Sequence, residues 1–274
     1  MRSPIWRSTG WAASGTTDRS SCGCRTSNRI TRTTSSERSA PRGGPSDSPA
    51  STDRATFRGG GVDWRWNYAS YLAACASIDA NLGRLVDALR ADGRLDDTII
   101  VFASDHGSHF RTRNLEYKRS PHDASIRVPL VIAGPGFTGG QRRRDLVTQL
   151  DLLPTLVAAA GGDAADVDGT PLQGDTGRGD VFVPISESQI GRAIRTPTHT
   201  LAVAARSPNP LAGHLRPAAD SYRLTHLYDN VADPHQHRNL VRDQASRPVV
   251  DELMDLLAQR IAEVEGATPR LVPR

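Results

Sequence analysis

The pattern of apolar and polar positions changes abruptly at Trp64. From there on, apolar side chains recur at steps of three and four residues, which is the spacing of one face of an amphipathic helix. The dipeptide Asp92-Gly93 interrupts the pattern and predicts the end of this helix. The apolar positions are Leu72, Cys75, Ile78, Leu82, Leu85, Val86 and Leu89.

Two short apolar runs follow and are typical of buried strands. Residues 98–103 are continuously apolar after a β-branched start, and residues 127–133 end at Gly134-Pro135-Gly136. Such uninterrupted runs are expected for strands buried on both faces, as in parallel sheets. A helix that leads into such a strand is half of a βαβ unit. The sequence therefore predicts an α/β fold with a mixed, mostly parallel sheet flanked by helices.

The rest of the chain predicts a small C-terminal α+β portion. Asp151 is expected to cap a helix over residues 152–160, which ends at Gly161. We therefore predict one α/β domain over residues 61–180 and a C-terminal subdomain over residues 181–274. The strands expected in the subdomain cover residues 193–194, 200–203 and 222–228, and its last helix covers about 248–264.

Residues 1–60 differ in composition from the rest. Ser, Thr, Arg and Gly dominate this segment, and it contains neither leucine nor valine. Such a segment buries too little apolar surface to offset its conformational entropy, so it is predicted to be disordered. Its arginines are scattered, and only Trp6, Trp11 and Phe57 are available to stack on bases. No nucleic-acid partner is therefore predicted.

No membrane segment and no disulfide framework are expected. The longest apolar run, Ile99–Ala103, is far too short to span a bilayer, and the first thirty residues do not resemble a signal peptide. A cytoplasmic protein without a membrane partner is therefore expected, and the oligomeric state stays open. The three cysteines lack the spacing of a disulfide framework or a zinc site.

Candidate functional side chains are expected in the segment Ser104-Asp105-His106-Gly107, directly after the first strand. Ligands of open α/β sheets bind beyond the carboxyl ends of strands. Asp105 offers a carboxylate oxygen and His106 an imidazole nitrogen, and Gly107 permits a sharp turn that directs both side chains toward one metal ion. The alternative is a capping aspartate and a surface histidine in an ordinary loop.

Lys118 and His122 follow in the same inter-strand loop. Lys118 is the only lysine of the chain. Its ammonium suits the non-bridging oxygens of an anionic tetrahedral substrate, and a histidine can hold such an oxygen or protonate a leaving group. The alternatives are a solvated charge at Lys118 and a hydrogen-bonded loop histidine at His122. His109 is expected at the surface.

An ordered series of motifs resembles the sulfatase family of the alkaline-phosphatase superfamily. The resemblance covers most of residues 68–241, and residues 68–172 are similar to the second half of the sulfatase catalytic domain. It implies an alkaline-phosphatase-like fold, incomplete here, with residues 61–180 as a partial catalytic domain. The similar motifs are Asp96-Asp97-Thr-Ile-Ile-Val-Phe-Ala-Ser-Asp-His-Gly107, Lys118, Ile126-Arg-Val-Pro-Leu, Gly134-Pro-Gly, Val147–Leu156, Gly169–Leu172, Leu227–Asn230, Asp233-Pro234 and Asn239-Leu240.

The resemblance implies a hydrolase that acts on sulfate esters of small molecules or carbohydrates. It implies a divalent cation, calcium in the first place with magnesium as the alternative, bound in part by Asp105 and His106. Lys118 is implied as a sulfate-binding residue, with His122 as a weaker candidate beside it. The nucleophile of the family is a formylglycine made from the Cys or Ser of a C/S-x-P-x-R motif.

This motif is absent from the sequence, because the segments after Cys22 and Cys24 lack its proline and its arginine spacing. The paired N-terminal aspartates that complete the metal site of the family are missing as well. We therefore interpret the chain as a truncated sulfatase and expect negligible turnover by this chain alone. Two alternatives stay open: a phosphonate or phosphate monoester hydrolase of the same superfamily, and a non-catalytic relic that keeps an anion pocket.

Overall fold

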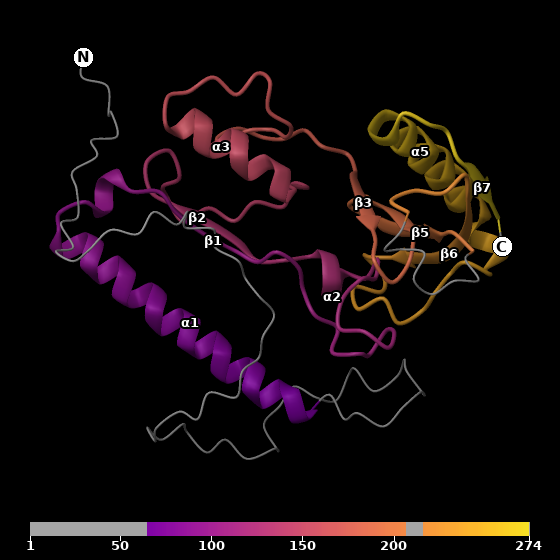
Figure 1. The fold of residues 1–274 in the computed structure, drawn as a ribbon, viewed down its shortest axis with the longest axis horizontal. Coiled ribbons are helices and arrows are strands. Elements are labelled where there is room, and N and C mark those ends of the chain that lie inside the picture. Colours follow the sequence, from indigo (N-terminus) through magenta and orange to yellow (C-terminus); the bar gives the residue numbers. More distant parts are fainter. Residues whose placement is uncertain (1–64, 207–215, 274) are drawn as a thin grey trace. The chain divides into compact units, whose positions relative to one another are not determined.

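The computed structural model describes residues 65–206 and 216–273 of the chain (Figure 1). The predicted disorder of residues 1–60 lies outside the described residues. Helices and two β-sheets make up the described part, which confirms the α/β class with sheets flanked by helices. None of the helices in these two ranges combines the length and apolarity that a bilayer-spanning segment needs.

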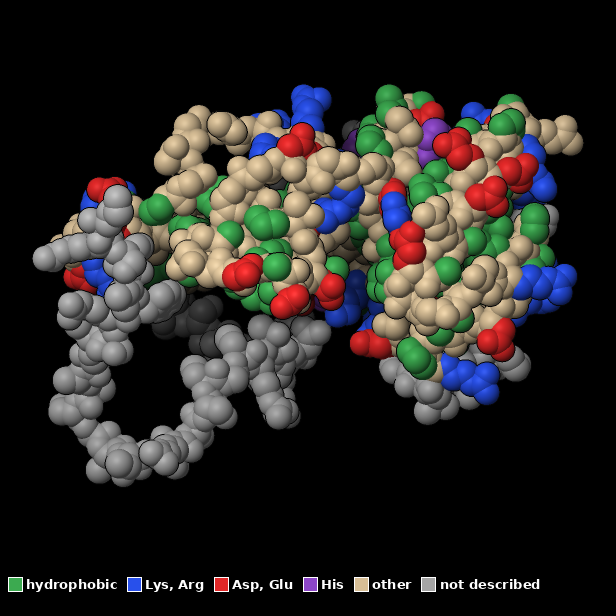
Figure 2. Space-filling model, turned by 90° about the horizontal axis from the view of Figure 1, so that it is seen from above, with side chains coloured by type: hydrophobic (Ala, Val, Ile, Leu, Met, Phe, Trp, Pro, Cys, Tyr) green, Lys and Arg blue, Asp and Glu red, His purple; other side chains and the backbone are tan. Residues whose placement is uncertain are grey.

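Helix α1 (Arg65–Ala91) confirms the amphipathic helix predicted from the apolar spacing. It ends where predicted, because Gly93 takes a left-handed φ of 66° before the 3-10 turn η1 (Leu95–Asp97). Its apolar stripe stays exposed, with an exposed fraction of 53% for both Ile78 and Leu85. Apolar side chains also lie among charged ones on the face shown in Figure 2. Helix α1 therefore gains little stability from burial within the described residues.

The first sheet pairs β1 (Ile100–Ala103) with β2 (Leu130–Ala133). The two strands are antiparallel, which differs from the parallel arrangement expected from their apolar runs. The reason is the connection between them. Residues 104–129 contain only the one-turn helix α2 (Asp123–Ile126), whereas the crossover between two parallel strands is usually a longer helix that packs on the sheet. The chain therefore returns beside β1 in the opposite direction.

The second sheet has the strand order β3-β4-β5-β6-β7. Its first four strands pair in antiparallel fashion, and β7 lies parallel to β6. The strands expected within residues 193–228 are confirmed. The sequence pattern does not predict β3, which contains Pro184, or β7, which has three residues. The strands are β3 (Val181–Ile185), β4 (Gly191–Arg195), β5 (His199–Ala204), β6 (Ser221–Asp229) and β7 (Arg270–Val272).

Helix α5 (Arg247–Glu265) confirms the predicted last helix, and it buries its apolar side against the second sheet. It follows the 3-10 turn η3 (Gln244–Ser246) and ends at Gly266, which has a left-handed φ of 71°. Leu257 and Ile261 of this helix are almost completely buried. The main hydrophobic core of the described residues therefore lies between α5 and the second sheet. Its sheet residues include Ile194, Leu201, Val203, Leu224 and Leu227.

Helix α3 (Leu152–Ala159) confirms the remaining predicted helix and follows the 3-10 turn η2 (Gln149–Asp151). Asp151 precedes α3 as expected, but its side chain does not cap that helix. Its buried carboxylate accepts hydrogen bonds from the N–H groups of Thr148 (2.7 Å) and Thr170 (2.8 Å) and from the Arg178 guanidinium (2.6 and 2.7 Å). Burial alone would raise the pKa of Asp151, but these hydrogen bonds outweigh it and lower the pKa. Asp151 therefore fastens the start of α3 to the loop that follows it.

Truncating Leu257 tests whether α5 anchors the core. Leu257→Ala is expected to lower the free energy of unfolding by about 2–5 kcal/mol, because it removes buried methyl groups and leaves a cavity. Leu85→Ala, on the exposed stripe of α1, is the matched control and is expected to change the free energy of unfolding by less than about 0.5 kcal/mol. Urea unfolding followed by circular dichroism measures both. Equal losses in the two variants would contradict this assignment of the core.

Candidate functional site

The segment after β1 is held in place by backbone contacts from two directions. Gln149 donates from its amide nitrogen to the carbonyls of Ser104 (2.6 Å) and Asp105 (2.8 Å). On the other side, the N–H of Gly107 donates to the carbonyl of Ser125 (2.8 Å). A Cβ at position 107 would lie 2.1 Å from the carbonyl oxygen of Ala124. Gly107 is therefore needed for close packing against α2, and not for a left-handed φ.

Lys118 meets His106 at the end of β1. Nζ of Lys118 lies 2.7 Å from Nε2 of His106, and Nδ1 of the same ring lies 2.9 Å from the carbonyl oxygen of Gly107. Because a carbonyl only accepts, Nδ1 carries the ring proton, and the lone pair of Nε2 accepts from the Lys118 ammonium. A carboxylate oxygen of Asp105 lies 3.5 Å from this Nε2. The structure thus brings Asp105, His106 and Lys118 together around one imidazole nitrogen.

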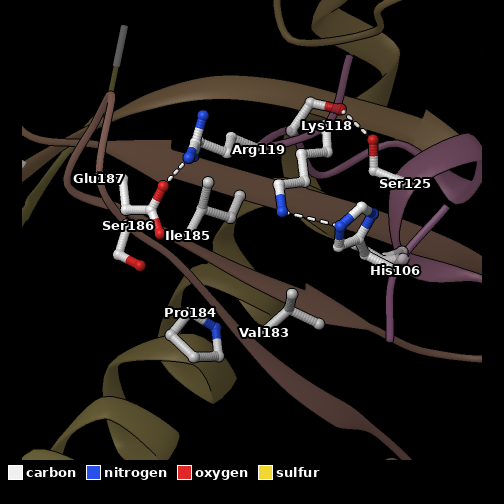
Figure 3. Close-up of a pocket in the computed structure, with 11 residues that line it drawn as sticks. His106, Lys118, Arg119, Ser125, Val183, Pro184, Ile185, Ser186 and Glu187 are labelled. Atoms are coloured by element: carbon white, nitrogen blue, oxygen red, sulfur yellow. Dashed lines mark hydrogen bonds and ion pairs between the residues drawn. The ribbon is translucent and has the colours of Figure 1, made fainter. Parts of the chain in front are cut away.

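His106 and Lys118 border a cavity of about 190 Å³ (Figure 3). Besides His106, its lining comes from residues 118–120, residues 125–126 and residues 183–187. The last of these segments is β3 with the start of the following turn, and it supplies the apolar side chains Val183, Pro184 and Ile185. Charged groups lie on the opposite side, where Lys118 and Arg119 point into the space (Figure 3). The cavity therefore combines the Lys118 ammonium and the Arg119–Glu187 ion pair with an apolar wall.

His122 does not border this cavity. Its side chain is buried, with Nε2 3.0 Å from the hydroxyl oxygen of Tyr228 and its ring 5.3 Å from the ring of His226. Burial lowers the pKa of His122 to about 2, and the nearby His226 and Arg113 act in the same direction. These contacts are those of a hydrogen-bonded loop histidine, the alternative that the sequence leaves open.

His109 is buried, so the expectation that it lies at the surface is wrong. Its N–H donates to the carbonyl of Tyr117 (2.8 Å), and its Nε2 lies 3.2 Å from the carbonyl oxygen of Lys118. A carbonyl only accepts, so Nε2 is the donor in this contact. The side chain therefore braces the loop from inside, directly behind the lysine.

The loop of residues 104–129 is also fastened to the second sheet and its loops. Arg113 donates to the carbonyls of His235 and Gln236. The buried side-chain amide of Gln236 accepts from the N–H of Asp123 (2.7 Å), and the Asp123 carboxylate pairs with Arg195 of β4 (3.1 Å). These contacts join residues 72 to 123 positions apart, and no local pattern in the sequence marks such pairs.

Asp105 and His106 do not complete a metal site by themselves. Calcium takes six to eight oxygen ligands and magnesium takes six. Within residues 65–206 and 216–273, no group of three or more His, Cys, Asp and Glu side chains is placed to hold a metal ion. The exposed Asp105 carboxylate and the Nε2 lone pair of His106 are donors of suitable type, but they amount to two ligands.

Comparison with known proteins matches the family model Sulfatase to residues 23–162. Arylsulfatase K of Canis lupus familiaris is 39% identical over 93 residues, which are 34% of this chain and 17% of that protein. Choline-sulfatase of Rhizobium meliloti (strain 1021) is 41% identical over 92 residues, or 34% of this chain and 18% of that protein. The matched segment thus spans less than a fifth of the length of either relative.

Solved structures resemble a larger part of the chain. The structure of BT4656 in complex with its substrate D-glucosamine-2-N,6-O-disulfate has a TM-score of 0.61 and 26% identity, over 73% of this chain and 41% of that one. A phosphonate monoester hydrolase of Agrobacterium radiobacter has a TM-score of 0.53 and 25% identity, over 69% and 40%. The fold is therefore that of sulfatases and of related hydrolases of tetrahedral esters.

The buried His122 predicts a specific pH dependence of stability. The unfolded chain protonates this histidine below about pH 6.5, whereas the folded chain keeps it neutral down to about pH 2. Its stabilising contribution is therefore complete above pH 6.5 and is lost as the pH falls, by about 2 kcal/mol between pH 7 and pH 5. His122→Gln keeps a polar group and is expected to reduce this acid sensitivity, whereas His199→Gln at a partly exposed position is expected to preserve it. Urea unfolding at both pH values measures the difference, and an unchanged slope in the His122 variant would refute the assignment.

Proposed function

Since this chain belongs to the sulfatase family, we propose that it forms part of a hydrolase of sulfate esters and that the cavity beside Lys118 receives the sulfuryl group. One observation carries this proposal. The only lysine of the chain is held 2.7 Å from the imidazole of His106, at the border of a cavity with space for a small ligand. An ammonium group that is held in place and has no carboxylate partner among the described residues is suited to bind a tetrahedral anion.

Lys118 is proposed to bind the non-bridging sulfuryl oxygens. No carboxylate among the described residues forms an ion pair with Lys118, so its charge is available to an incoming anion. Ammonium groups form charge-assisted hydrogen bonds with oxyanions, and such bonds are roughly twice as strong as neutral ones. For His122, a sulfate-binding or proton-donating role stays a prediction, and its contacts favour a role in holding the loop through Tyr228.

Asp105 and His106 are proposed to supply two ligands of a divalent cation, calcium in the first place with magnesium as the alternative. Sulfatases generally use a divalent metal, which provides positive charge next to the reacting ester. The remaining ligands would have to come from groups outside the described residues. The lone pair of Nε2 is shared with Lys118, so a cation bound there would release the ammonium toward the cavity.

The proposed substrate is a sulfate ester of a carbohydrate or another small molecule. A structural neighbour of this chain binds D-glucosamine-2-N,6-O-disulfate as its substrate. The serine hydroxyls around the cavity are groups that hydrogen-bond to sugar hydroxyls, whereas β3 offers an apolar surface to the rest of the ring. Because the sequence contains no C/S-x-P-x-R motif, catalysis would require a nucleophile outside this chain.

A phosphonate monoester hydrolase is the second candidate, and the structural neighbour from Agrobacterium radiobacter favours it. Sulfate, phosphonate and phosphate esters share a tetrahedral centre with anionic oxygens. A single ammonium beside a metal site serves all of them, so the arrangement around Lys118 fits both candidates. Relative affinity for a sulfate and a phosphonate ester separates the two.

Replacing Lys118 tests the anion site. Lys118→Met keeps the length of the side chain but removes its charge. It is expected to weaken binding of 4-nitrophenyl sulfate by about 10- to 100-fold, the loss of one hydrogen bond to a charged group. Arg127→Gln removes a largely exposed charge from the same loop and is expected to have little effect. Calorimetric titration measures both variants, with phenylphosphonate as the second ligand. Equal affinity in wild type and Lys118→Met would rule out this site, and a preference for phenylphosphonate would favour the second candidate.

Competition between a cation and Lys118 for His106 predicts a spectroscopic response. A protein labelled with lysine that carries ¹³C only at Cε gives one side-chain signal, because the chain has one lysine. Calcium or magnesium is expected to shift this signal in the wild type, and Asp105→Ala is expected to reduce the shift because it removes one ligand. A wild-type lysine signal that neither calcium nor magnesium shifts would contradict the proposed metal site.

A further inference from the structure

Lys118 is followed by a second cation, Arg119, whose contacts are of a different kind. The Arg119 guanidinium forms ion pairs with Glu116 (3.1 Å) of its own loop and with Glu187 of the turn between β3 and β4. Figure 3 shows the pair with Glu187 on one side of Ile185 and the Lys118 ammonium on the other. We propose that the β3–β4 turn, through Glu187 and Gln189, positions Lys118 for anion binding. This inference rests on the proposed function in one respect, namely that the ligand of Lys118 is an anion.

The backbone around Lys118 is held at two successive carbonyls. The carbonyl of Lys118 itself accepts from Nε2 of His109 (3.2 Å), and the carbonyl of Arg119 accepts from the amide nitrogen of Gln189 (2.6 Å). The second contact joins residues 70 positions apart. The β3–β4 turn therefore holds the main chain at the residue after Lys118. The conformation of the main chain at this point sets the direction of the Lys118 side chain.

The two neighbouring cations have divided roles. Arg119 is neutralised by two carboxylates, and its side chain is 30% exposed, as is that of Glu116. An Arg–carboxylate pair in such a partly buried place fixes geometry, because the planar guanidinium has a defined direction for each hydrogen bond. Lys118 has no carboxylate partner among the described residues. The turn thus uses the charge of Arg119 for attachment and leaves that of Lys118 for a ligand.

Backbone conformation indicates that this attachment is needed. Arg119 has a φ of 61° and Glu187 a φ of 71°. Both values are left-handed, a conformation that is unfavourable for residues other than glycine. Such conformations persist where surrounding contacts hold them, and here each of the two residues is the partner of the other. Loss of the ion pair would let both segments relax, and Lys118 with them.

The same turn belongs to the cavity itself. Residues 183–187 line the cavity opposite Lys118. The same segment therefore forms the apolar wall and, through Glu187, holds the loop of residues 104–129. This places positioning residues for the anion site in β3 and the turn after it, about 70 residues beyond Lys118 in the sequence. Glu187 and Gln189 are positioning residues, because they act on the ligand through Lys118.

The single lysine allows a direct test in the full chain. With ¹³C-lysine label, the Lys118 side-chain signal is recorded in wild type, Glu187→Ala, Gln189→Ala, Glu187→Asp and Asp251→Asn, each with and without inorganic sulfate. Glu187→Ala and Gln189→Ala are expected to move the signal and to weaken sulfate binding by about 3- to 10-fold. Glu187→Asp is expected to restore part of the affinity. Asp251→Asn breaks the exposed pair with Arg247 and is expected to match the wild type.

The outcomes separate the inference from the proposed function. If Glu187→Ala and Gln189→Ala are folded by circular dichroism and keep both the wild-type signal and the wild-type sulfate affinity, the positioning role is overturned. If Glu187→Ala does not fold, Gln189→Ala alone decides in the same way. If sulfate does not affect Lys118 in the wild type, while the two variants still move its signal, the proposed anion site fails and the positioning role stands.

Discussion

The hydrogen bond between the Lys118 ammonium and Nε2 of His106, 2.7 Å long, is the interaction on which this site depends. It requires the proton of the ring to sit on Nδ1, which the carbonyl of Gly107 secures at 2.9 Å. It also requires the strand end and a loop residue twelve positions later to meet. A positive charge is thereby held beside a cavity, and no carboxylate among the described residues forms an ion pair with it, so the charge is free to bind a tetrahedral anion as proposed.

The arrangement around this hydrogen bond comes from a part of the chain that is remote in sequence. The best-packed core lies between α5 and the second sheet, whereas α1 exposes much of its apolar stripe. The loop of residues 104–129, which contains Lys118, is attached to the second sheet and its loops through Arg113, Asp123 and Arg119. The contacts that hold the proposed anion site in place therefore come from the C-terminal sheet and its loops. The segment after β1 supplies the chemical groups, and the C-terminal sheet supplies their support.

Local sequence patterns predict the longer helices of this molecule and the candidate residues of its site. Helices α1 and α5 follow from apolar spacing, and helix α3 follows from the flanking Asp151 and Gly161. The position after a strand and the uniqueness of the lysine mark Asp105, His106 and Lys118 as candidates. The antiparallel pairing of β1 with β2 is not predicted, because apolar runs do not encode direction. The burial of His109 and the pairing of Arg119 with Glu187 arise from contacts that no spacing in the sequence reveals. A polar residue on a loop carries little local information about its burial, and this limits sequence analysis at the site.

A crystal structure of the full chain grown or soaked in sulfate tests the account most directly. Without a divalent cation, we expect a sulfate ion in the cavity lined by residues 183–187, with an oxygen at hydrogen-bond distance from Nζ of Lys118 and with the lysine still beside His106. A Lys118 side chain directed away from His106 and from this cavity, with no anion bound beside it, would contradict the central claim.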